Sequence, residues 1–103
     1  MVTGHWDEPV DGPLTEAALG RRLVAMGYRV AVYVYPPGTR FPPHTHAVDK
    51  VDAVLSGRFR ITLGEGAVEL QAGDWVEVHA GAVHSAEVLG EEPVVSLDAV
   101  RGP

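Results

Sequence analysis

The sequence predicts a single-domain, all-β barrel with one short N-terminal helix. The chain has 103 residues, which is enough for one hydrophobic core but not for two. From residue 28 onward, short apolar or alternating runs follow one another, and Gly or Pro residues separate them. Many short strands with such punctuation are typical of a sandwich or a closed barrel.

The N-terminal region predicts an arm followed by a helix. The first dozen residues are polar and broken by Gly and Pro, so we expect an arm outside the core. Leu19, Leu23 and Met26 recur at helical spacing, Thr15 is a suitable N-cap and Gly27 can end the helix. We therefore assign residues 1–27 to an arm and amphipathic helix and residues 28–103 to the barrel.

The remaining chain predicts strands throughout. Residues 28–35 alternate between two faces before Pro36 and Pro37 stop the strand. Further strands are expected around Phe41 and at residues 51–55, 59–63, 68–70, 76–78, 86–89 and 94–97.

Composition excludes several classes of function. The formal net charge of -6 argues against a nucleic-acid partner or an anionic membrane surface, because both select for clustered Lys and Arg. No apolar run is long enough to span a membrane, and we expect a cytoplasmic protein. The absence of cysteine excludes disulfides, thiolate nucleophiles and Cys-ligated metals. Any metal site must use histidine and carboxylate ligands, and a small molecule is the expected partner.

The histidines are the main chemical signal. His44 and His46 are two residues apart, so on an extended strand both imidazoles project from one face and can share a metal. Two half-exposed histidines on a strand are the alternative. His79 and His84 lie in a second strand-rich block that begins at Gly73.

These two blocks together resemble the two motifs of the cupin family, over about residues 28 to 100. The matching positions are Gly38, His44, His46, Gly57, Gly73, Gly81 and His84. The resemblance implies a double-stranded β-helix, a jelly-roll-like barrel, in which two histidines and a glutamate from the first motif and one histidine from the second hold a divalent metal. By this resemblance, the metal ligands here are His44, His46 and His84.

The sequence departs from the family pattern where the fourth ligand is expected. Lys50 occupies the glutamate position, and a protonated ammonium cannot ligate a metal. It must turn outward, pair with Asp49 or Asp52, or lose its proton. Asp52, Asp49, His79 or water remain candidates for the fourth ligand. The alternative for Asp52 is a surface pair with Lys50, and strand alternation favours an outer face for His79.

The expected cofactor is one divalent metal ion: Zn, Fe, Ni, Co or Mn. The first hypothesis is a metal-dependent enzyme of the oxygenase or isomerase type acting on a small molecule, with Asp52 as general base. The second is a non-catalytic module that binds or senses a small ligand or a metal. We also expect a homodimer, with contacts through the arm before Thr15 and the Tyr33/Tyr35 face.

Overall fold

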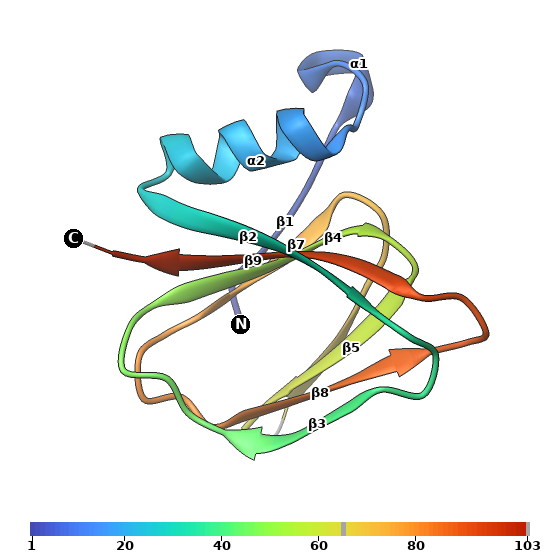
Figure 1. Cartoon of the computed structure of the whole chain (residues 1–103). Coiled ribbons are helices and arrows are strands. Elements are labelled where there is room, and N and C mark those ends of the chain that lie inside the picture. Colours follow the sequence, from blue (N-terminus) through green and yellow to red (C-terminus); the bar gives the residue numbers. More distant parts are fainter. Residues whose placement is uncertain (65, 103) are drawn as a thin grey trace.

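The fold consists of two antiparallel sheets that face each other, and the described residues also form two helices, one more than the sequence predicted. The computed structural model describes residues 1–64 and 66–102. Figure 1 shows α2 lying over the sheet that contains β2, β9 and β4, with β3, β8 and β5 on the opposite side. The elements are β1 (Thr3–His5), α1 (Glu8–Asp11), α2 (Glu16–Ala25), β2 (Tyr28–Tyr35), β3 (Arg40–His44), β4 (Lys50–Ser56), β5 (Arg58–Leu63), β6 (Gly66–Leu70), β7 (Asp74–Val78), β8 (His84–Leu89) and β9 (Val94–Arg101).

The strand order places β4 at the centre of the larger sheet, between β7 and β9. The five-stranded sheet has the order β1-β7-β4-β9-β2, and the four-stranded sheet has the order β3-β8-β5-β6. The predicted all-β barrel is confirmed. The predicted helix is also confirmed, and its N-cap forms as expected because the Thr15 hydroxyl accepts a hydrogen bond from the Ala18 N–H at 3.0 Å. Among the described residues, no helix is both long enough and apolar enough to cross a membrane.

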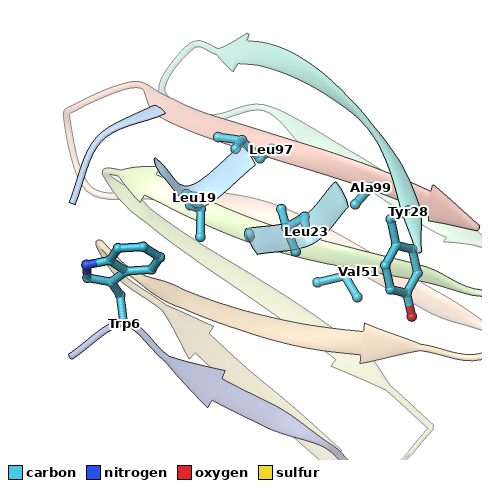
Figure 2. Close-up of a cluster of buried hydrophobic side chains, with 8 residues drawn as sticks. Trp6, Leu19, Leu23, Tyr28, Val51, Leu97 and Ala99 are labelled. Atoms are coloured by element: carbon cyan, nitrogen blue, oxygen red, sulfur yellow. The ribbon is translucent and has the colours of Figure 1, made fainter. Parts of the chain in front are cut away.

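The five-stranded sheet is buried on both faces, so the protein has two hydrophobic cores and the expectation of only one is wrong. The first core lies between α2 and the sheet, and Figure 2 shows its side chains converging: Trp6, Leu19, Leu23, Tyr28, Val51, Ala53, Leu97 and Ala99. The second lies between the two sheets and contains Val54, Phe59, Ile61, Leu70, Val76, Val78, Val88 and Val94. Burial of this apolar surface is the main favourable term for the fold.

Strand alternation directs a polar set of side chains into the barrel. On β4, Val51 and Ala53 face α2, so Lys50 and Asp52 share the inner face with Val54. On β9, Leu97 and Ala99 face α2, and by the same alternation Ser96 and Asp98 face inward. The space between the two sheets is therefore apolar in the second core and lined by charged groups toward one end of the barrel.

The expectation of an N-terminal arm outside the core is wrong. β1 pairs with β7, and Trp6 is 6% exposed within the first core. The Trp6 indole N–H donates to the Gly12 carbonyl at 2.8 Å, and the Arg22 guanidinium lies 4.9 Å from the indole ring. The polar composition of the first dozen residues predicted a free arm. The large Trp6 side chain buries enough apolar surface to fix this segment against the sheet. The assignment of residues 28–103 to a separate barrel segment stays a prediction.

Candidate metal centre

Three histidines from two adjoining segments converge at one end of the barrel. His44 is the last residue of β3 and lies opposite His84, the first residue of β8, in the strand register. His46 lies two residues beyond β3. One ring nitrogen from each imidazole lies within 4.8 Å of the others, and the ring centroids are 4.1 to 5.0 Å apart. The structure thus brings together the three histidines that the sequence singled out.

Backbone carbonyls fix the orientation of two of the rings. His44 Nδ1 lies 2.7 Å from the Pro42 carbonyl oxygen, and His84 Nδ1 lies 3.0 Å from that of Ala82. A carbonyl only accepts hydrogen bonds, so each Nδ1 carries a proton and donates it, which leaves the lone pair on Nε2. Hydrogen bonding of one ring nitrogen to a carbonyl is the usual way in which proteins orient a metal-binding imidazole.

One ring nitrogen on each of two histidines is buried without a partner. Among the described residues, His46 Nε2 and His84 Nε2 have no solvent contact and no hydrogen-bond partner. Such orphaned atoms are costly unless something binds them. Burial, followed by the positive charge of Lys50, lowers the pKa of His46 and favours the neutral imidazole that ligates metals. The donor set fits a divalent transition metal, which prefers imidazole nitrogen.

A buried cluster of three charges lies in the wall beside the histidines. The Lys50 ammonium nitrogen is 2.7 Å from Asp98 Oδ1 and 3.1 Å from Asp52 Oδ1. Lys50 is 6% exposed and Asp52 is 7% exposed. Burial alone would lower the pKa of Lys50, but the two carboxylates outweigh it and hold that pKa above its ordinary value. Burial raises the pKa of Asp52, and Asp98, directly opposite on β9, adds to this.

This cluster settles how the chain accommodates a lysine at the glutamate position. Lys50 neither turns outward nor pairs with Asp49. It forms an ion pair with Asp52, which was one of the expected possibilities. Lys50 and Asp52 do pair, but both side chains are buried, so the expectation that they pair at the surface is wrong. Asp98 is the member that sequence reasoning missed. Its signal was an acidic residue within the apolar run of β9, on the same face as Val94 and Ser96.

The histidines and the charged cluster line one pocket with a volume of about 160 Å³. The rest of its lining is mainly aromatic: Tyr35 packs 4.9 Å from Phe41 and 5.6 Å from Phe59, measured between ring centroids. Burial, with Asp98 and Asp52 adding to it, raises the pKa of Tyr35 to about 12. The pocket therefore joins a candidate metal centre to a charged wall and an apolar wall.

Two other candidates for the fourth ligand lie outside this pocket. Asp49 Oδ1 accepts a hydrogen bond from the Ala80 N–H at 2.7 Å. The His79 side chain is 70% exposed and lies 4.0 Å from Asp49 Oδ1. The outer position of His79 follows from the inward position of Val76 and Val78, as alternation predicted. Asp52 is the only one of the three that lines the pocket.

Comparison with known proteins identifies the family. A cupin domain model matches residues 31–100. No curated protein matches the chain by sequence. Among solved structures, a conserved protein with a double-stranded β-helix domain from Klebsiella pneumoniae is 30% identical, with a TM-score of 0.63 over 73% of this chain and 67% of its own.

Two further structures share the fold. A conserved protein of unknown function from Streptococcus pyogenes is 22% identical, with a TM-score of 0.66 over 75% of this chain. The DMSP lyase DddQ from Ruegeria pomeroyi is 25% identical, with a TM-score of 0.66 over 74% of this chain. The chain spans 66% of the former and 39% of the latter. The family model covers most of the chain, the two sheets have the arrangement of a double-stranded β-helix, and the chain belongs to the cupin family.

Proposed function

We propose that the protein is a small metal-dependent cupin enzyme in which His44, His46 and His84 hold one divalent metal ion through Nε2. The observation that carries this proposal is the convergence of three imidazoles within 4.8 Å, two of them with buried and unpartnered Nε2 atoms. A bound divalent ion supplies Lewis-acid polarisation of a ligand oxygen. The reaction class we propose is that of an oxygenase or an isomerase acting on a small molecule.

The chain's own residues suit such a reaction. Tyr35, Phe41 and Phe59 give the pocket one aromatic wall beside its charged wall. Asp52 is the carboxylate proposed to accept a proton from the substrate, because it lines the pocket and its raised pKa brings it closer to neutral pH. A lyase among the structural neighbours supports an enzyme on this fold, although the chain covers only 39% of that protein.

A non-catalytic module that binds or senses a small ligand is the second candidate. The observation that favours it is Lys50, because a lysine replaces the carboxylate ligand that the family resemblance implies and the ion pairs occupy the only acids lining the pocket. The enzyme requires the metal centre, whereas the binding module works with or without a metal. They differ in whether a bound ligand is chemically changed.

We expect the protein purified without chelator or nickel resin to contain one divalent metal ion per chain. Elemental analysis by mass spectrometry measures this ratio and names the metal. Oxygen consumption and product analysis across a panel of small oxo acids, hydroxy acids and sugars then separate the enzyme from the binding module. A metal content far below one per chain, unchanged after incubation with each candidate ion, would contradict the proposal.

We also propose a homodimer that pairs through β2. This strand is at the edge of the five-stranded sheet, and Val32, Tyr33 and Val34 on it are exposed. An edge strand with exposed apolar side chains is a template for pairing with a second chain. Light scattering at micromolar concentration is expected to give twice the mass of a single chain, and Tyr33→Lys is expected to shift the protein toward monomer. A wild-type protein of single-chain mass would refute the dimer.

A further inference from the structure

The ammonium of Lys50 is held in place at the pocket wall. Asp98 Oδ1 lies 2.7 Å from its nitrogen and Asp52 Oδ1 lies 3.1 Å away, on two neighbouring strands. An ammonium has three N–H donors, and two ion-pair contacts can use at most two of them. Because Lys50 lines the pocket, a molecule bound there can take the third. Few lysine side chains are so restricted, since an exposed one keeps most of its rotamer freedom.

The charges of the site call for an anion. A dication on the three imidazoles and the Lys50 ammonium together carry three positive charges, and Asp52 and Asp98 carry at most two negative ones. At least one net positive charge therefore remains beside the buried Lys50 and Asp52 side chains. Uncompensated charge in such a place is costly. A ligand with one negative charge removes this cost, whereas a neutral or cationic ligand leaves it in place or increases it.

The size and lining of the pocket limit the ligand further. A volume of about 160 Å³ is close to that of an engineered cavity that binds benzene, so the pocket suits a molecule of about six non-hydrogen atoms. Tyr35, Phe41 and Phe59 offer an apolar surface to the part of the ligand that carries no charge. The ligand is therefore short, with an anionic oxygen group at one end and little polarity at the other.

We propose that Lys50 anchors a small monoanionic oxygen ligand, such as a short carboxylate or an enolate, at the His44–His46–His84 metal centre. Asp52 and Asp98 are positioning residues that hold the ammonium toward the ligand. This inference rests on the proposed metal centre and adds the chemical class of the molecule that binds there. It also gives a role to the lysine that occupies the family's glutamate position.

Acetate and acetamide test the inference because they have nearly the same shape and differ in charge. The protein is loaded with Co²⁺, whose visible absorption reports changes at the metal, and each compound is titrated in by absorption and by calorimetry. We expect acetate to bind at least about tenfold more tightly than acetamide. Because the metal ion alone favours an anion, variants must isolate the contribution of Lys50.

The Lys50→Met/Asp98→Asn double variant removes one positive and one negative charge, so the net charge of the pocket is unchanged. We expect its acetate affinity to fall at least about tenfold while its acetamide affinity and Co²⁺ content stay at wild-type values. Lys50→Met/Asp52→Asn is a second charge-matched variant, for use if the first does not fold. Arg60→Met/Glu87→Gln also removes one positive and one negative charge, at cross-strand positions outside the pocket, and is expected to leave acetate binding unchanged.

The outcomes separate this inference from the proposed metal centre. If the wild-type protein fails to bind Co²⁺, the metal centre itself is refuted and the inference with it. If Co²⁺ binds to every variant and the charge-matched variants bind acetate as tightly as wild type, the metal centre stands and the anchoring role of Lys50 is overturned. Loss of Co²⁺ from both charge-matched variants would also overturn it, because Lys50 would then act in retaining the metal.

Discussion

His84→Ala is expected to lose metal affinity by at least about 100-fold while the protein stays folded. His84 Nε2 is one of two buried ring nitrogens without a partner, and the ring lies 4.1 Å from that of His44. Removing even an outer hydrogen-bond partner of a metal ligand typically costs about 10- to 100-fold in affinity, so removing the ligand itself costs more. The ring is not a member of either apolar core, so the main packing survives.

A competition titration against a chromogenic chelator measures the metal affinity, and thermal unfolding in the presence of chelator measures the fold without its metal. His79→Ala is the matched control, because it removes the same side chain from an exposed position outside the pocket. It is expected to bind metal as wild type does. Equal losses in the two variants would contradict the assignment of His84 as a ligand and of His79 as an outer residue.

Two members of the histidine triad were predictable from their spacing along the chain. His44 and His46 are two residues apart, and the register of β3 and β8 places His44 opposite His84. The family resemblance then selected His84 over His79. Most strand boundaries were also predictable from nearby residues, since Gly and Pro separate nearly every pair of predicted strands.

The pairing of Lys50 with Asp52 was among the expected outcomes, but the place of Asp98 in the cluster was not predictable, because it depends on a pairing between distant strands. Asp52 and Asp98 lie opposite each other only when β4 and β9 are aligned in this register, and no local pattern sets that register. The run from Val51 to Leu55 is apolar on both faces because α2 covers one side and the barrel covers the other. Such a run does not reveal which face its one acidic residue occupies.

Lys50→Met is expected to lower the free energy of unfolding by about 3–5 kcal/mol, the usual cost of removing one partner from a buried ion pair. The change leaves Asp52 and Asp98 opposite each other with no counter-charge, and Asp52 is only 7% exposed. Chemical denaturation of wild type and variant, both in the presence of chelator, measures the difference without any contribution from metal. A loss below about 1 kcal/mol would mean that the cluster adds little to the fold.

The pH dependence identifies the cause of this loss. Two facing carboxylates without the ammonium hold a proton more tightly in the folded protein than in the unfolded chain, so the folded state gains stability as pH falls. The gap between wild type and Lys50→Met is therefore expected to be smaller at about pH 5 than at about pH 8. A lost packing contact would give the same gap at both. The Lys50→Met/Asp52→Asn/Asp98→Asn variant removes the facing charges altogether. We expect it to recover more than half of the lost stability and to lose the pH dependence. The reason is that the unpaired negative charge, and not the missing lysine stem, destabilises the single variant.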